Sequence, residues 1–202
     1  RCGSKTLLVT QSFETVGQMS CNPSIGGIGK GHLAKEVDAL GGVMAKAADA
    51  AGIHFRILNK KKGPAVWATR SQADRSLYKS FIQKEIKEQA NLDYVNGEVV
   101  DLVIKKDTIW GVQLKNNEII HCKSIILTAG TFLSGVIHVG NKSYSAGRLG
   151  EEASNKLADR MQELDLMMGR LKTGTPPRLD GRTINFDNMI KQPGDEPRPV
   201  FS

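Results

Sequence analysis

The chain has 202 residues, of which 40% are hydrophobic and 24% are charged, a composition that is ordinary for a globular protein. The formal net charge of +7 permits an anionic partner without requiring one. The three cysteines, Cys2, Cys21 and Cys122, form no C-x-x-C pair. This spacing argues against a disulfide framework or a bound metal and for a reducing compartment such as the cytoplasm. The longest apolar stretch, residues 125–139, is too short to span a bilayer, so no membrane association is expected.

The first predicted element is a buried strand over residues 6–10, typical of a parallel sheet. Four glycines follow between Gly26 and Gly31, and we expect helices over residues 32–40 and 43–51 after them. Dense glycines let a backbone approach a ligand closely, and a helix N-terminus offers free N–H groups to an anion. The sequence therefore predicts a phosphate- or cofactor-binding loop, with the thiol of Cys21 nearby.

Two familiar glycine motifs fit this loop poorly. A nucleotide P-loop is excluded because Ser24 replaces its first glycine and Gly31 replaces its metal-binding hydroxyl. The dinucleotide fingerprint G-x-G-x-x-G/A matches formally at Gly29, Gly31 and Ala34. That fingerprint should follow a buried strand directly, whereas a turn-forming sequence precedes this loop. We therefore interpret the loop as something other than the primary pyrophosphate turn.

The rest of the chain alternates between helical and strand patterns. We predict a strand over residues 53–58, and then a long amphipathic helix over 72–90 with Ser71 as its N-cap and Asp74 as a capping-box acid. The remaining predicted elements are strands over residues 99–104, 108–114, 118–122, 124–128 and 166–169 and a helix over 151–164. This order predicts a nucleotide-binding α/β domain with a small antiparallel layer. The 124–128 strand is expected to be buried and to end in the turn Ala129-Gly130, where open α/β sheets bind ligands.

Two loops concentrate basic residues. Residues 56–70 hold five basic side chains and no acid, and residues 170–182 hold four basic side chains and one acid. Either cluster alone is best explained as a solvated loop. The presence of two makes a nucleic acid or a phosphate-bearing ligand a hypothesis. The candidate contacts are Lys60, Lys61, Arg170, Lys172 and Arg178.

Several long motifs are similar to one known family. They are the runs at residues 17–33 (GQMSCNPSIGGIGKGHL), 35–42 (KEVDALGG), 62–70 (KGPAVWATR), 131–133 (TFL) and 169–178 (GRLKTGTPPR). Together they resemble the MnmG/GidA family over essentially the whole chain. The resemblance implies an FAD-dependent enzyme that adds a carboxymethylaminomethyl group to carbon 5 of the wobble uridine of tRNA. It also implies NADH and methylene-tetrahydrofolate as co-substrates, the GTPase MnmE as partner, and a homodimer.

The same resemblance implies a fold and roles for single residues. The fold would be an FAD-binding, Rossmann-like domain of the glutathione-reductase type over residues 1–97 and 123–169. Residues 98–122 would form the antiparallel insertion, and residues 170–202 would begin an inserted domain. Cys21 would be one of two catalytic cysteines. The residues expected at the cofactor are Val99, Ser154, Gly26, Gly27, Gly29, Ala129 and Gly130.

The family pattern also predicts parts that these residues do not contain. The glycine fingerprint would precede residue 1, and the second catalytic cysteine would follow residue 202. We therefore expect a fragment that is inactive alone. Many dinucleotide folds end the second strand in an acid that binds the ribose, but here the strand ends at Thr10-Gln11-Ser12 and Glu14 is the only nearby acid. The ribose would therefore be bound by another group, or by Glu14 if the loop folds back.

Three alternatives remain open. Cys21 could be an ordinary buried thiol, which is the preferred interpretation of its spacing alone; the resemblance favours a nucleophile. The chain could belong to a related flavin- and folate-dependent tRNA uridine methyltransferase. It could also be a non-catalytic module that binds tRNA or docks a GTPase, which would hold no flavin.

Overall fold

The computed structural model describes residues 2–20 and 22–202. The chain divides into two compact units, each described by itself. Unit 1 comprises Arg1–Thr6, Glu14–Asp93 and Thr173–Ser202, and unit 2 comprises Leu7–Phe13 and Tyr94–Lys172. The helices found among the described residues are all too short or too polar to cross a membrane.

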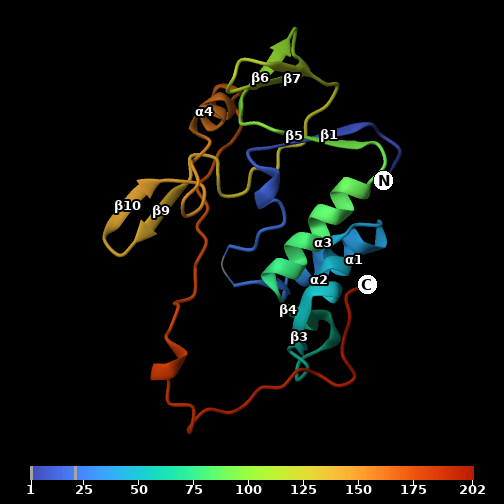
Figure 1. Ribbon diagram of the computed structural model, residues 1–202, viewed down its shortest axis with the longest axis vertical. Helices are drawn as coiled ribbons and strands as arrows, with labels where there is room; N and C mark the ends of the chain where they lie inside the picture. Colours follow the sequence, from blue (N-terminus) through green and yellow to red (C-terminus); the bar gives the residue numbers. More distant parts are fainter. Residues whose placement is uncertain (1, 21) are drawn as a thin grey trace. The chain divides into compact units, whose positions relative to one another are not determined.

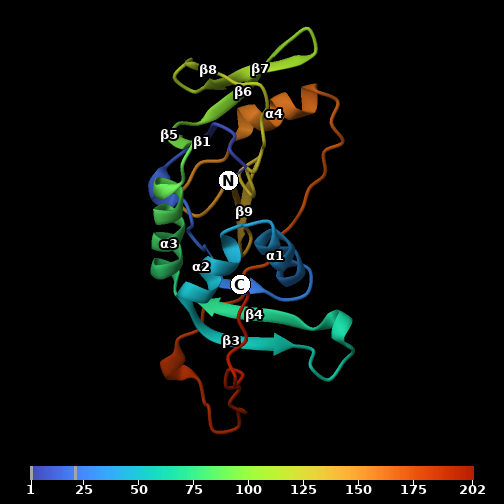
Figure 2. The ribbon, with the colours of Figure 1, turned by 90° about the vertical axis from the view of Figure 1, so that its right-hand side faces the viewer.

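Unit 1 is built on a three-stranded antiparallel sheet with the strand order β2-β4-β3. Its strands are β2 (Ser24–Gly26), β3 (Gly52–Leu58) and β4 (Ala68–Ala73). Its helices are α1 (Lys30–Ala39), α2 (Met44–Ala51) and α3 (Arg75–Glu88), with short 3-10 turns at Pro64–Val66 and Gly181–Thr183. Another 3-10 turn, Phe13–Thr15, begins with the last residue of a unit 2 segment and ends in unit 1. Figure 2 shows α1 and α2 on one side of the β3–β4 pair. The predicted helices around residues 32–40 and 43–51 and the strand at 53–58 are confirmed.

The start of the long helix was predicted wrongly. Ser71, the expected N-cap, lies in the central strand β4, opposite Ile25 on one side and Phe55 on the other. Its side chain is fully buried, and its hydroxyl donates to the Ala48 carbonyl oxygen at 3.3 Å. The true N-cap is Asp74, whose carboxylate accepts the backbone N–H of Leu77 at 2.8 Å. This polar segment has only a weak local preference for strand structure, and its pairing with strands on both sides is what places it in the sheet.

The core of unit 1 is made mostly of small side chains. Its buried members are Ile25, Ala34, Ala45, Ala47, Ala48, Ala51, Ala73, Tyr78 and Phe201. Alanine faces let helices lie close to a sheet but supply little apolar volume. Tyr78 and Phe201 therefore provide much of the bulk in this core.

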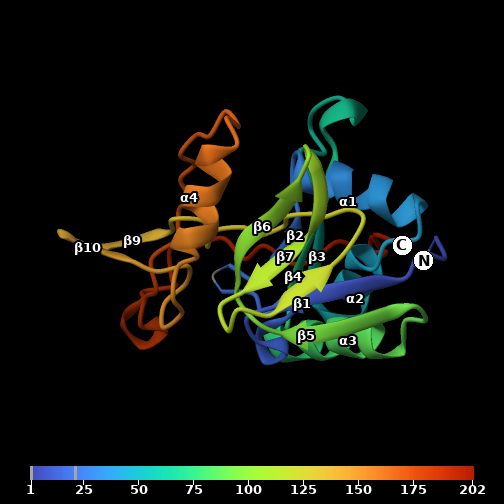
Figure 3. The same ribbon diagram turned by 90° about the horizontal axis from the view of Figure 1, so that it is seen from above.

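Unit 2 contains most of the first strand of the chain. Strand β1 (Thr6–Thr10) pairs with β5 (Leu92–Asn96), and Figure 3 shows the two side by side. The N–H of Thr6 donates to Asn91 at 2.8 Å, and the N–H of Gly97 donates to Thr10 at 2.7 Å. Because both strands advance together between these bonds, they run parallel, as predicted. Among the described residues β1 pairs with β5 alone, so it is partly exposed rather than buried.

The predicted antiparallel meander of unit 2 is also present. Its strands are β6 (Val99–Lys105), β7 (Thr108–Leu114) and β8 (Ile119–His121), in the order β6-β7-β8. Lys106 and Asp107 both have positive φ, 47° and 58°, the pattern of a two-residue type I′ turn between β6 and β7. Helix α4 (Asn155–Glu163) packs Leu157 against Leu102 and Val112 of this meander.

Two predicted strands of unit 2 are absent, and one hairpin was missed. Residues 124–128 and 166–169 have no strand structure, and Ile126 is 88% exposed. Neither segment has a partner strand within the described part of the chain, so an apolar sequence alone gives no hydrogen-bonded ladder and no buried face. The missed hairpin consists of β9 (Val136–Val139) and β10 (Lys142–Ser145), visible in Figure 1.

Candidate functional site

The glycine loop of unit 1 connects β2 to α1 through left-handed backbone. The φ angles of Gly26, Gly27 and Gly29 are +114°, +90° and +83°, which residues with a side chain rarely adopt. The loop is closed by the N–H of Gly27 donating to Thr69 at 3.0 Å and that of Gly31 donating to Gly27 at 2.8 Å. Glycine is therefore required here by the backbone itself.

This loop has a closed side and an open side. A Cβ on Gly26 would overlap the carbonyl oxygen of Thr69, and one on Gly31 would lie 3.0 Å from the same oxygen. At Gly27 and Gly29, by contrast, the Cβ position has no atom of the described residues within 4 Å apart from the glycine and its two chain neighbours. These two glycines form the open side, at which a ligand could contact the backbone closely.

Helix α1 begins at the end of this loop and adds a partial positive charge. Its first turn is Lys30-Gly31-His32, so the N-terminal dipole is not offset by an acidic side chain of that turn. The N–H of Gly29 donates to His32 Nδ1 at 3.3 Å, and Lys30 Nζ donates back to the Ser24 carbonyl at 3.1 Å. Cys21, the predicted nucleophile, lies outside the described residues, three positions before β2 begins.

In unit 2 a polar pair forms at the carboxyl end of β1. Ser154, at the N-cap of α4, is only 7% exposed, and its Oγ accepts a 3.2 Å hydrogen bond from Gln11 Nε2. The backbone N–H of Ser154 donates to Phe132 at 2.9 Å, which ties the start of α4 to the segment after the Ala129-Gly130 turn. In that turn the N–H of Phe132 donates to Ala129 at 3.2 Å, and Gly130 has a φ of +59°.

Val99 is connected to this region through the core of unit 2. It opens β6 and packs in the same apolar cluster as Leu133 and Leu157, which lie one residue after Phe132 and three residues after Ser154. Of the predicted cofactor residues, Val99, Ser154, Ala129 and Gly130 belong to unit 2, whereas the three loop glycines belong to unit 1. Gln11 was missed as a candidate. Its position directly after an apolar strand was the signal that could have found it.

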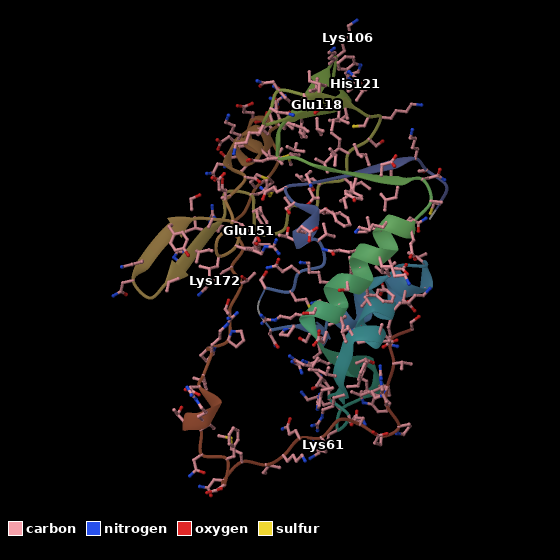
Figure 4. The ribbon with its side chains drawn as sticks, viewed as in Figure 1. Lys61, Lys106, Glu118, His121, Glu151 and Lys172 are labelled. Carbon is pink, nitrogen blue, oxygen red and sulfur yellow. The ribbon has the colours of Figure 1, made fainter. Side chains whose placement is uncertain are left out.

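The predicted basic contacts of unit 1 differ in their surroundings. Lys60 Nζ forms an ion pair with Asp195 at 2.9 Å, so its charge is already compensated. The backbone N–H of Ile57, followed by Lys60, lowers the pKa of the Asp195 carboxyl group below its ordinary value. Lys61 is exposed at the start of the β3–β4 connection (Figure 4) and has no ion pair among the described residues.

The second basic cluster is divided between the two units. Arg170 and Lys172 belong to unit 2, where Arg170 Nη1 donates to the Ser134 carbonyl at 3.2 Å and Lys172 is exposed (Figure 4). Arg178 is exposed in unit 1, and the nearby Arg182 is neutralised by Asp180 at 2.6 Å. Across residues 2–20 and 22–202 no three His, Cys, Asp or Glu side chains are arranged to hold a metal ion.

Two of these features are typical of α/β proteins that bind phosphorylated ligands. One is the polar pair at the carboxyl end of parallel strands, and the other is the glycine loop that leads into a helix. Comparison with known proteins narrows this class. The family model described as Glucose inhibited division protein A, or GidA, matches residues 1–202. The chain belongs to the GidA family.

Solved structures agree with this assignment. Two crystal forms of Aquifex aeolicus GidA, form II and form I, are each 46% identical to the chain, with a TM-score of 0.91. Each match covers 99% of this chain and 33% of the Aquifex chain, so the chain spans about a third of the length of these relatives. The GidA-related protein from Thermus thermophilus is 16% identical over 80% of this chain and 58% of its own, with a TM-score of 0.52, and shares the fold alone.

Proposed function

We propose that this chain contributes the first part of the flavin site of an FAD-dependent tRNA-modifying enzyme. The complete enzyme would add a carboxymethylaminomethyl group to carbon 5 of the wobble uridine, acting with the GTPase MnmE as a homodimer in the cytoplasm. Membership of the GidA family carries the proposal. The hydrogen bond between the exposed Gln11 and the buried Ser154, at the carboxyl end of a parallel strand, supports it independently.

The residues of unit 2 suit the nucleotide half of FAD. At the carboxyl end of β1, the Gln11 amide and the Ser154 hydroxyl can donate to and accept from ribose hydroxyls, so no acidic side chain is needed. The nearby turn at Ala129 and Gly130 presents a backbone with little side-chain bulk. Val99 would supply apolar and backbone contact beside it.

The glycine loop of unit 1 suits a flat or anionic part of the cofactor. The open positions at Gly27 and Gly29 would let a ring or phosphate lie against the backbone, and the α1 N-terminus would favour negative charge there. Bound FAD would supply two-electron transfer with NADH as the reductant and methylene-tetrahydrofolate as the one-carbon donor. The residues of this chain would hold and orient the cofactor and exclude water.

Cys21 is proposed as the nucleophile. Its thiolate would form a bond to the uracil ring carbon next to carbon 5, and the electron pair of the ring double bond would shift toward the carbonyl group. Carbon 5 would then attack the methylene carbon of the iminium form of methylene-tetrahydrofolate, and the carbon–nitrogen double-bond electrons would pass to the folate nitrogen. An amine that carries a carboxymethyl group would have to replace the folate nitrogen on that carbon to complete the added group. After carbon 5 loses its proton, the sulfur would leave and the double bond would return. In the sequence Cys21 precedes β2, and the glycine loop and the start of α1 follow that strand. A helix N-terminus close to the thiol would favour the thiolate.

Exposed cations are proposed to contact tRNA phosphates. Lys61, Lys172 and Arg178 are the free candidates in the described chain. Lys60 and Arg170 are already bonded within the protein, and they would bind RNA only by giving up these partners.

The test uses the complete encoded protein. Purified protein should show flavin absorbance, and it should restore the carboxymethylaminomethyl nucleoside to tRNA in cells that lack their own enzyme, as measured by mass spectrometry of digested tRNA. A methyl group at carbon 5 instead would support the methyltransferase alternative. Colourless protein that still binds tRNA would support the non-catalytic module.

A further inference from the structure

The C-terminal segment of unit 1 docks against the free edge of β3. The N–H of Asp195 donates to Phe55 at 2.9 Å, and the N–H of Ile57 donates to Asp195 Oδ2 at 2.7 Å. A Cβ on Gly194 would lie 3.2 Å from the Phe55 carbonyl, so glycine allows the close approach. His54 Nε2 lies 3.2 Å from the Gln192 carbonyl oxygen. Figure 2 shows this segment passing β3 on its way to the C-terminus.

Asp49 of α2 anchors the end of the same segment. Its carboxylate accepts the backbone N–H of Phe201 at 2.9 and 3.1 Å and that of Ser202 at 2.9 Å. Arg198 donates to the Asp49 carbonyl at 2.6 Å, and its guanidinium lies 3.8 Å from the centre of the Phe55 ring. An acid in the last turn of a helix is unfavourable to the helix dipole. The Asp49 carboxylate therefore does not stabilise its own helix, and its hydrogen bonds are made to the C-terminal segment.

Phe201 reaches from this anchor to the glycine loop. Its ring is 4% exposed and lies 2.9 Å from the position of a Cβ on Gly26, in a core that also contains Ile25 and Ala34. On α1, Lys35 Nζ donates to the carbonyl of Phe201 at 3.3 Å. The segment thus contacts both the start of the loop and the helix that follows it.

A glycine-rich loop has high backbone entropy, so its conformation must be imposed by what surrounds it. Gly26 is held between Thr69 and Phe201, whereas Gly27 and Gly29 are open. We propose that residues 192–202 form a clamp that positions the glycine loop, with Phe201 as the positioning residue and Asp49 as its anchor. A loop held in advance lowers the entropic cost of binding a ligand. The link to flavin rests on the proposed function, but the clamp itself does not.

Hydrogen–deuterium exchange of the complete protein tests the clamp directly. Asp49→Ala should raise the exchange rate of the amides of residues 26–31 by about tenfold or more, because the charged acceptor of two anchoring amides is lost. Exchange in α3 should stay unchanged. Alanine is the better helix former, so α2 itself is not weakened by this change. Lys46→Ala, on the exposed side of the same helix, is the matched control and should leave the loop as it is.

A second pair of variants separates positioning from general loosening of the core. Phe201→Leu keeps an apolar side chain but removes the ring beside Gly26, whereas Tyr78→Leu alters the same core from α3. Only Phe201→Leu should speed loop exchange while the protein stays folded, and only it should raise the Kd for FAD severalfold. Equal loop exchange in both variants would overturn the clamp. So would faster exchange at residues 201–202 in Asp49→Ala with an unchanged loop. If the wild-type protein failed to bind flavin, the proposed function would be contradicted. The exchange measurements would still show whether residues 192–202 position the glycine loop.

Discussion

Gln11 Nε2 donates a 3.2 Å hydrogen bond to Ser154 Oγ, joining the carboxyl end of β1 to the N-cap of α4 across 143 positions of sequence. The Ser154 hydroxyl makes no capping bond to its own helix, and Gln11 is exposed, so both groups keep hydrogen-bonding capacity for a ligand. The pair therefore combines a structural contact with free hydrogen-bonding capacity where α/β sheets bind ligands.

Ser154→Ala should weaken FAD binding by about tenfold, because it removes a ligand contact and leaves the Gln11 amide without its acceptor. Flavin titration of the apoprotein, followed by fluorescence, measures the effect. Ser143→Ala is the matched control, since Ser143 is an exposed serine whose hydroxyl is 2.7 Å from His138 on the β9–β10 hairpin. Equal flavin affinity in the two variants would remove Ser154 from the cofactor site.

The glycines of the loop should respond differently to alanine. At Gly26 the new Cβ meets the Thr69 carbonyl and the ring of Phe201, whereas at Gly27 it meets open space and only the positive φ is strained. Strain alone costs about 1–2 kcal/mol. We expect Gly26→Ala to destabilise the protein by about 2 kcal/mol more than Gly27→Ala does, as measured by chemical denaturation.

Flavin affinity adds a second readout for the same two variants. Gly27→Ala places a methyl group on the open side and should reduce FAD binding more than it reduces stability. A Gly27→Ala protein with native flavin affinity would show that this side of the loop does not face the cofactor.

Much of the fold could be predicted because its signals are local. The β6–β7 hairpin follows from alternating apolar residues around Lys106-Asp107, and α4 follows from its apolar face. The failures involve long-range pairing. Residues 124–128 resemble a buried strand, but a strand also needs a partner, which local sequence does not specify. Ser71 was misassigned because the strands on either side of it, and not its own sequence, place it in the sheet.

The residues of the candidate site also differ in whether local sequence could identify them. Dense glycines revealed the loop because positive φ angles require them locally. Gln11 and Phe201 could not be identified in this way. Gln11 gains its importance from Ser154, and Phe201 from Asp49 and Gly26, all distant in sequence.

Lowering the pH should weaken the contact between the C-terminal segment and β3. The folded-state pKa of Asp195 is lowered below 3.8 by the Ile57 N–H and by Lys60, so its ionised form stabilises the folded state. That contribution is fully present above the unfolded-state pKa and is lost as the pH falls from about 3.8 through the folded-state value. The stability difference between wild type and Asp195→Asn should therefore shrink in this range, as measured by urea denaturation at each pH. A difference that stays constant down to the lowest pH would contradict this assignment.

Cys21→Ala in the complete enzyme should keep bound FAD and abolish wobble modification, because the nucleophile is lost while the cofactor contacts remain. Flavin absorbance and nucleoside analysis of tRNA measure the two effects separately. Cys122→Ala, at a half-buried free cysteine after β8, is the control and should retain activity. Retained modification in Cys21→Ala would exclude the catalytic role.

Variants of the adjacent residues Lys60 and Lys61 should distinguish a lysine that binds RNA from one that forms an ion pair within the protein. Lys61→Ala removes an exposed cation without an ion pair among the described residues, so tRNA binding should weaken and the salt dependence of log K should fall by roughly 0.7–0.9 for each phosphate that is no longer neutralised. Lys60→Ala instead removes the partner of Asp195, and it should mainly increase exchange at the C-terminal segment. Filter binding of tRNA over a series of salt concentrations distinguishes the two. An unchanged salt slope in Lys61→Ala would place this loop outside the tRNA interface, because a cation that contacts phosphate must release counterions when it binds.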